Sequence, residues 1–285
     1  MLQVAFCASE NAAMQEPVLF RGRLDQSFSL AKKLGYDGVE LHIRDASEID
    51  TQALFRQNET TGIKVAAIGT GLAARVDGLS LADKNETGRR QAIERVKGCL
   101  DLADHFGCCV ILGSLRGNVP SGGEKSEVVT RLRYSMLELG NDIEQKNCSL
   151  VLEVINRYEN NYFNTVRETS VFLEALDLDC VKMHLDTFHM NIEEADMFEA
   201  IRESGSRLGH FHLADNTRWY PGHGRIDFRS VLKSLSQIRY NGWISMECLP
   251  KPTELEAAEK GLAYIRTLLE EIDGVKRKED NNGKI

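Results

Sequence analysis

The chain has 285 residues, of which 42% are hydrophobic and 27% are charged, and its net charge at pH 7 is −8. This composition is typical of a globular protein, and the acidic balance disfavours nucleic acid or an anionic membrane as the main partner. No segment reaches the roughly 18 apolar residues that a membrane-spanning helix needs, and the N-terminus lacks the regions of a secretory signal. We therefore expect a cytoplasmic protein that binds neither nucleic acid nor membranes.

Eight short segments of β-forming residues alternate with segments of helical periodicity. In chain order, the expected strands are 3–9, 38–43, 64–69, 108–114, 149–155, 181–188, 208–215 and 242–249. The expected helices include 24–35, 86–107, 127–146 and 254–272. Gly35, Gly62 and Gly107 stand where helices would end, as C-capping glycines do. Strands that alternate with helices in this way indicate βα units in a parallel sheet.

Eight βα units in about 270 residues favour a closed (β/α)8 barrel of the α/β class, the TIM barrel, over an open doubly wound sheet. No GxGxxG motif follows the first strand, so a dinucleotide-binding fold loses its main support. We expect one barrel domain over residues 1–273 and a polar C-terminal tail over residues 274–285. The seven cysteines show no paired spacing and mostly lie in apolar segments, so we expect reduced, buried thiols.

Four successive expected strands carry a metal-ligating residue near their C-terminal ends, namely Glu153, Asp186, His212 and Glu247. In a barrel these strand ends converge on one axis, and catalytic groups cluster at that face. Two glutamates, one aspartate and one histidine form a hard, oxygen-rich site that suits one divalent ion. Mn²⁺ is favoured, with Mg²⁺ or Co²⁺ as alternatives. Three carboxylates at this spacing would repel one another without a cation.

Two further histidines share these strands. By the period-2 alternation of a strand, His184 and His210 face the same side as Asp186 and His212 but lie one layer deeper. We therefore expect them to bond neighbouring groups and not a metal.

Several segments resemble the signature segments of the xylose-isomerase-like TIM barrels. They are LEVINRYENNYFNT (152–165), LDTFHMNIEE (185–194), HFHLADNTRWYPGHGRIDF (210–228) and SMECLP (245–250). The likeness is closest to the ketose 3-epimerase branch, typified by D-tagatose 3-epimerase. Within that branch, GYDGVELHIRD (35–45) and AIGTGLAARVDGLSL (67–81) resemble the 5-keto-L-gluconate epimerase subgroup.

The resemblance implies an isomerase that epimerises a ketose or keto-sugar acid with the help of a divalent metal. The family's metal ligands map onto the four strand-end residues named above. Glu153 and Glu247 would also be the two bases that exchange a proton at the carbon next to the ketone, by way of an enediolate. Glu159, His189 and Arg218 map onto substrate-contacting positions.

Two arginines suggest the class of sugar. Arg116 follows the fourth expected strand and Arg75 follows the third, so both belong to the face that carries the metal ligands. A carboxylate gains bidentate, charge-assisted hydrogen bonds from a guanidinium. We therefore predict that Arg116, helped by Arg75, binds the carboxylate of an acidic open-chain sugar of the 5-keto-L-gluconate or D-tagaturonate type.

Other functions stay open at this point. A hydroxypyruvate-isomerase-like aldose-ketose isomerase would use the same groups. An endonuclease-IV-like metal hydrolase would need more His, Asp and Glu ligands and a basic surface, which the charge of −8 disfavours. A non-catalytic sugar-sensing barrel would be expected to lack one of the paired glutamates, and both are present. A homo-oligomer is one option for barrels of this group.

Overall fold

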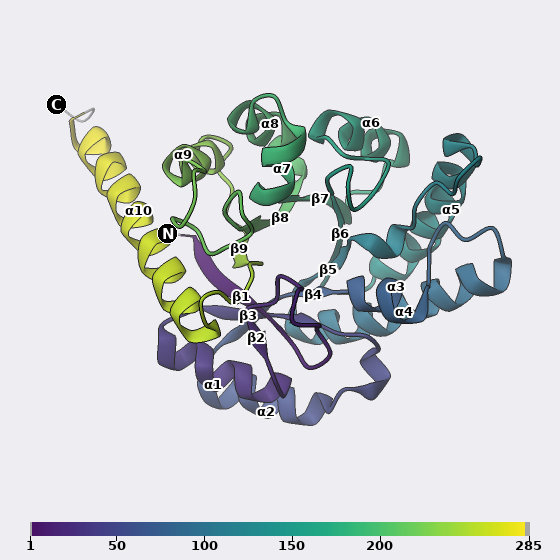
Figure 1. Ribbon diagram of the computed structural model, residues 1–285, viewed down its shortest axis with the longest axis horizontal. Helices are drawn as coiled ribbons and strands as arrows, with labels where there is room; N and C mark the ends of the chain where they lie inside the picture. Colours follow the sequence, from purple (N-terminus) through teal and green to yellow (C-terminus); the bar gives the residue numbers. More distant parts are fainter. Residues whose placement is uncertain (1, 283–285) are drawn as a thin grey trace.

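The computed structural model describes the backbone of residues 2–282 and the side chains of residues 2–274. The strands are β1 (Gln3–Ser9), β2 (Phe20–Arg21), β3 (Gly38–His42), β4 (Lys64–Gly69), β5 (Cys109–Leu112), β6 (Ser149–Glu153), β7 (Val181–Asp186), β8 (Leu208–Leu213) and β9 (Trp243–Met246). They form one parallel sheet that closes where β1 pairs with β9, and helices surround it (Figure 1).

The helices follow the strands along the chain. They are α1 (Leu24–Leu34), α2 (Thr51–Thr61), α3 (Gly71–Asp77), α4 (Glu86–Phe106), α5 (Lys125–Ile143), α6 (Val166–Leu176), α7 (Thr187–Glu193), α8 (Met197–Ser204), α9 (Phe228–Gln237) and α10 (Glu254–Asn282). Short 3-10 turns lie at η1 (Ala46–Glu48), η2 (Ser114–Arg116) and η3 (Gly205–Arg207).

The predicted barrel is confirmed, and each of its eight strands lies within the segment that the sequence indicated. The short β2 is an addition that pairs with the end of β1 beyond the barrel wall. Both faces of the barrel strands are buried, because one face fills the barrel interior and the other packs against helices. This double burial explains why the strands read as apolar runs in the sequence.

The helix ends also follow local sequence signals. Gly35, Gly62 and Gly107 end α1, α2 and α4 in the left-handed conformation, with φ of 86°, 74° and 64°. Glycine adopts this conformation without the steric penalty that a Cβ brings, so the predicted C-caps are confirmed. All seven cysteines are free thiols, and five of them are buried.

The last helix is longer than the sequence suggested. α10 extends to Asn282, so the backbone of residues 274–282, which we expected as a polar tail, continues the helix. Residues 283–285 of that tail lie outside the described residues. The division of the chain into a barrel domain and a tail stays a prediction. Within residues 2–282, no helix combines the length and the apolarity needed to cross a bilayer.

Asp215 organises the long loop that follows β8. Its fully buried carboxylate accepts hydrogen bonds of 2.7–3.2 Å from five backbone N–H groups, those of Asn216, Gly222, Gly224, Arg225 and Ile226. A Cβ at Gly224 would overlap the side chains of Asp215 and Asn216, so this packing requires a glycine at the second glycine position of PGHG. One buried carboxylate thereby fixes a loop that carries a predicted substrate contact, Arg218.

We expect Asp215→Ala to lower the free energy of unfolding by about 3–5 kcal/mol, because several buried N–H groups lose their acceptor at once. Urea unfolding measures this change. Asp196→Ala is the matched control, since Asp196 caps α8 by accepting from two backbone N–H groups and its loss should cost about 1 kcal/mol. Equal losses in the two variants would contradict the organising role of Asp215.

Candidate active site at the C-terminal end of the barrel

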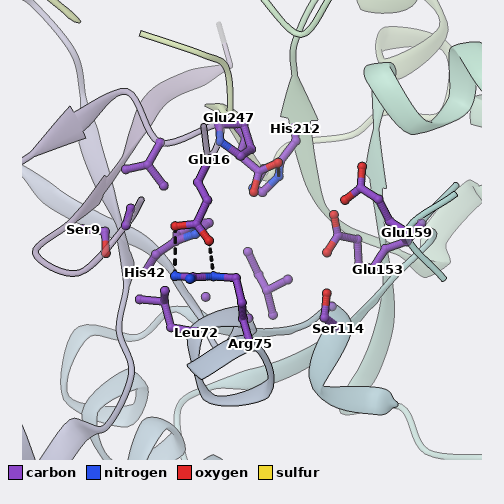
Figure 2. Close-up of a pocket in the computed structure, with 18 of the residues that line it drawn as sticks. Ser9, Glu16, His42, Leu72, Arg75, Ser114, Glu153, Glu159, His212 and Glu247 are labelled. Atoms are coloured by element: carbon purple, nitrogen blue, oxygen red, sulfur yellow. Dashed lines mark hydrogen bonds and ion pairs between the residues drawn. The ribbon is translucent and has the colours of Figure 1, made fainter. Parts of the chain in front are cut away.

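A cavity of about 330 Å³ opens at the C-terminal ends of the strands. Seven of the nine predicted site residues line it, namely Glu153, His212, Glu247, Glu159, His189, Arg218 and Arg75. Figure 2 shows the two glutamates Glu153 and Glu159 on one side of the cavity and Glu247 beside His212 on another.

The four predicted metal ligands come together, and three of them line this cavity, while Asp186 is fully buried beside them. One ligand atom each from Glu153, Asp186, His212 and Glu247 lies within 4.8 Å of the others. The sheet register causes this convergence, since Asp186 ends β7 directly opposite His212 on β8, while Glu153 ends β6. Glu247 directly follows β9. All four are buried or nearly so, with exposed fractions of 0–9%.

The polar atoms of this group fit a divalent cation. Asp186 Oδ2 and His212 Nδ1 are buried and have no hydrogen-bond partner among the described residues. Burial raises the pKa of Asp186 to about 6, because removal from water disfavours the charged carboxylate. The nearby charge of His189 lowers this pKa only in part. A cation bound to these carboxylates would supply the missing partner for both atoms. The donor set of three carboxylates and one imidazole suits Mn²⁺, Mg²⁺ or Co²⁺.

Glu40, which was not predicted from the sequence, lies at the centre of a histidine cluster beneath this group. Its fully buried Oε1 is 2.7 Å from His42 Nε2 and 2.8 Å from His212 Nε2. Its Oε2 is 2.7 Å from His210 Nε2. With Nε2 of His212 facing Glu40, Nδ1 is the nitrogen that remains for a metal, 3.8 Å from Glu247 Oε2. A carboxylate behind a ligating imidazole fixes the tautomer and the ring orientation.

The Glu40 carboxylate and the His212 imidazole each stabilise the charged form of the other. Burial raises the pKa of Glu40, but His212 and His210 outweigh it and hold the pKa well below its ordinary value. Burial likewise lowers the pKa of His212, but the Glu40 and Glu247 carboxylates raise it well above its ordinary value. The sequence carries a signal for Glu40, because VELH places Glu40 and His42 on the same face of β3. A search for polar residues at strand ends misses Glu40, because Glu40 lies within β3 and not at its end.

His184 differs from its prediction. Neither of its ring nitrogens makes a hydrogen bond with the part of the chain that the structure describes, and the Glu153 carboxylate lies 3.8 Å away. Burial lowers the pKa of His184 well below its ordinary value, so the ring is neutral and packs against His212, with ring centroids 4.0 Å apart. The expectation that His184 bonds a neighbour is therefore wrong. His210 behaves as expected, because it bonds Glu40 and also lies 3.2 Å from Ser245 Oγ.

Three predicted substrate contacts face the cavity. Arg218 donates to Glu159 Oε1 at 2.9 Å and to Glu247 Oε2 at 3.0 Å, and its guanidinium lies over the Phe188 ring. His189 is almost fully buried, and its Nε2 is 3.5 Å from Glu153 Oε1. Arg218 and His189 thus each contact one of the two proposed bases.

Arg116 lies elsewhere than predicted. Its side chain is fully buried, and its guanidinium donates to the backbone carbonyls of Glu153, Tyr162 and Phe163. It is not among the residues that line the cavity. The prediction that Arg116 binds a substrate carboxylate is therefore wrong. Because η2 turns this side chain inward, Arg116 instead fixes the end of β6 to the loop that follows it.

Arg75 reaches the cavity as predicted, but it has a partner that the sequence did not reveal. Its Nη2 is 3.0 Å from Glu16 Oε2, and its Nε contacts Glu16 Oε1. The Arg75 side chain is 43% exposed and that of Glu16 is 20% exposed. Figure 2 shows the two side chains meeting within the cavity.

The profile of the family described as "Xylose isomerase-like TIM barrel" matches residues 28–268. This chain belongs to that family. L-ribulose 3-epimerase of Mesorhizobium japonicum is 29% identical to it over 253 residues, which are 87% of this chain and 83% of that protein. The 3-dehydro-D-guloside 4-epimerase of Escherichia coli is 27% identical over 271 residues, which are 89% of this chain and 98% of that protein.

Solved structures extend the family comparison to three dimensions. The structure of D-psicose 3-epimerase with D-tagatose from Clostridium cellulolyticum superposes with a TM-score of 0.80 at 25% identity, covering 94% of this chain and 99% of that one. The homologues across most of the chain are sugar epimerases, which confirms the predicted isomerase class and the ketose 3-epimerase branch. The finer assignment to the 5-keto-L-gluconate subgroup stays a prediction.

We expect EDTA-treated protein to bind one Mn²⁺ per chain, measured by equilibrium dialysis with elemental analysis, and to unfold at a higher temperature once loaded. Asp186→Asn should weaken this binding by at least about tenfold, because one buried charge of the ligand set is lost. Glu159→Gln is the control and should keep the stoichiometry, since Glu159 is not in the group of four. Two or three ions per chain would instead favour the hydrolase alternative.

Gly113→Ala should weaken Mn²⁺ binding by about tenfold without unfolding the protein, because the added Cβ would overlap Glu153 Oε2 and displace that carboxylate. Gly98→Ala is the control, since the nearest atom to its Cβ would be Ala46 Cβ at an ordinary 3.5 Å. Dialysis and thermal unfolding of both variants measure the difference. Unchanged Mn²⁺ affinity in Gly113→Ala would remove Glu153 from the ligand set.

Proposed function

We propose that the protein is a divalent-metal-dependent epimerase that inverts a ketose at the carbon next to its carbonyl group. The observation that carries this proposal is the group of three carboxylates and one imidazole at the cavity, with two buried ligand atoms left unpartnered among the described residues. Glu153, Asp186, His212 and Glu247 would hold the ion. When bound, a divalent ion supplies Lewis acidity, which lowers the pKa of a C–H bond next to a carbonyl.

The two glutamates are suited to act on opposite faces of one substrate carbon. Glu153 ends β6 and Glu247 follows β9, so they approach the barrel axis from strands three places apart in the ring. Inversion requires that one carboxylate removes the proton from one face and that the other returns a proton to the opposite face. Burial raises the pKa of Glu247, but His212 and Arg218 hold it well below its ordinary value, so Glu247 is ionised.

The neighbouring groups would orient the substrate and these bases. Arg218 bridges Glu247 and Glu159 and so fixes the carboxylate of one base. The remaining N–H groups of Arg218 can donate to the oxygens of a sugar chain. The imidazole of His189, which lies 3.5 Å from Glu153, can do the same. Positioning of this kind contributes to rate because the reacting carbon must lie within reach of both carboxylates.

The relatives act at equivalent carbons. A 3-epimerase of a 2-ketose and a 4-epimerase of a 3-keto sugar both invert the carbon next to the keto group. This chemistry needs the same two bases whichever carbon carries the carbonyl. We propose an uncharged 2-ketose as the substrate class and C3 as the inverted carbon. The sequence-based preference for a keto acid combined Arg116, Arg75 and the likeness to the 5-keto-L-gluconate subgroup. Of the two arginines, Arg116 is buried against backbone carbonyls and Arg75 is paired with Glu16.

A 1,2-isomerisation is the second candidate reaction, because it needs proton removal from the neighbouring carbon by the same groups. The two reactions differ in the carbon that exchanges its proton with solvent. Incubation of the Mn²⁺-loaded protein with D-tagatose or L-ribulose in D2O distinguishes them by NMR, since deuterium at C3 reports epimerisation and deuterium at C1 reports isomerisation.

We expect Glu153→Gln and Glu247→Gln each to stay folded and to lose epimerisation by several orders of magnitude, because an amide cannot accept the proton. One of the two variants should still exchange the C3 proton of one epimer with D2O while forming none of the other. Glu174→Gln, an exposed change outside the cavity lining, is the control and should epimerise normally. Near-normal turnover by either active-site variant would exclude that glutamate as a base.

A further inference from the structure

The pair of Glu16 and Arg75 crosses the mouth of the cavity and is built from two separate segments. Glu16 belongs to the loop between β1 and β2, and Arg75 lies in the last turn of α3, which follows β4. Both side chains line the cavity, and Figure 2 shows them meeting within it. We call this pair the Glu16–Arg75 clasp.

Arg75, one half of the clasp, comes from the wall of the barrel opposite His212. In the ring of eight barrel strands, β4 is four places from β8, which carries His212, so α3 extends from the opposite wall. A sugar whose carbonyl end faces the four-ligand group would therefore present its other end to the clasp.

The loop that carries Glu16 is held in place by its own hydrogen bonds. Glu16 Oε2 accepts from the backbone N–H of Ala13 at 2.7 Å. Arg21 donates to the backbone carbonyls of Ala13, Glu16 and Val18, so it fixes the loop from behind. Glu16 is therefore presented at a defined place and is not a free surface carboxylate.

Each arginine and histidine among the described residues that line the cavity already faces a carboxylate. Among these described residues, Arg218 is bonded to Glu159 and Glu247, Arg75 is bonded to Glu16, and no lysine is present. A substrate carboxylate that approached Arg75 would share its guanidinium with Glu16 and be repelled by that like charge. A sugar hydroxyl avoids this conflict, because it can donate to Glu16 and accept from Arg75 at the same time.

We propose that the Glu16–Arg75 clasp is the subsite for the substrate end remote from the carbonyl, and that it selects an uncharged hydroxymethyl end over a carboxylate. The proposal deepens the proposed function and rests on it for the orientation of the sugar. Arg75 supplies the attraction that either end group would feel. Glu16 supplies the discrimination, so its charge decides which end group binds.

D-Tagatose and D-tagaturonate make a matched pair of probes, because they differ only in a hydroxymethyl or carboxylate group at that end. We would measure the Kd of each for Mn²⁺-loaded protein by calorimetry, at low and at high salt. For the wild type we expect D-tagatose to bind more tightly. Glu16→Gln keeps the shape of the side chain and removes its charge, which leaves Arg75 free to pair with a carboxylate.

In Glu16→Gln, D-tagaturonate should bind about tenfold more tightly than in the wild type, because its carboxylate forms a charge-assisted hydrogen bond with Arg75. D-Tagatose should bind a few-fold more weakly, because its hydroxyl loses a charged acceptor. The tighter binding of the acid should diminish at high salt, which screens the new ion pair. It should vanish in the double variant Glu16→Gln/Arg75→Met, where no cation remains to receive the carboxylate.

Glu48→Gln is the control for removal of one negative charge, since Glu48 pairs with Arg44 outside the cavity lining and should leave both constants unchanged. The proposed role of the clasp would be wrong if the wild type bound both sugars equally. It would also be wrong if the ratio of the two Kd values were the same in Glu16→Gln as in the wild type. Binding does not require proton transfer, so a failure of the two-base mechanism would appear in the D2O experiment while these constants stayed as predicted.

Discussion

The burial of one carboxylate at the centre of the barrel is the constraint on which the site depends. Burying a charge without partners costs several kcal/mol, so Glu40 requires hydrogen-bond donors within the barrel. Three imidazoles supply them, from His42 on the same strand and from His210 and His212 on β8. This need for donors explains why β8 turns its histidines toward Glu40. It also explains why His212 directs Nδ1, and not Nε2, to the cavity.

The register of the parallel strands places the metal-ligand candidates relative to the buried histidines around Glu40. Asp186 pairs with His212 across β7 and β8, and Glu153 pairs with His184 across β6 and β7. A slip of one residue in any of these strands would turn its polar side chain to the helix-facing side of the sheet, because side chains alternate along a strand. The ligand group and the histidine layer beneath it are therefore consequences of one set of strand pairings.

Two further side chains hold the segments that surround the site. Asp215 orders the loop that carries Arg218, and Arg116 fixes the segment after β6 by binding backbone carbonyls. Neither side chain reaches the cavity, yet each holds a residue that does. The mouth is formed by the segments after β1 and β4, where Glu16 and Arg75 meet. The group of four candidate metal ligands and the pair of Glu16 and Arg75 thus come from different parts of the same end of the barrel.

The sequence by itself determined the barrel, its eight strands and the convergence of Glu153, Asp186, His212 and Glu247. It could do so because strand periodicity and position at a strand end are local properties, and a closed parallel sheet brings all such ends to one rim. Only the tertiary structure decided the roles of Arg116, Arg75 and Glu40. Arg116 and Arg75 occupy equivalent places after neighbouring strands, but one side chain turns inward to backbone carbonyls and the other meets Glu16, 59 residues away in the chain. The direction of a loop side chain depends on which distant groups can satisfy its charge, and that information arises only when the chain has folded.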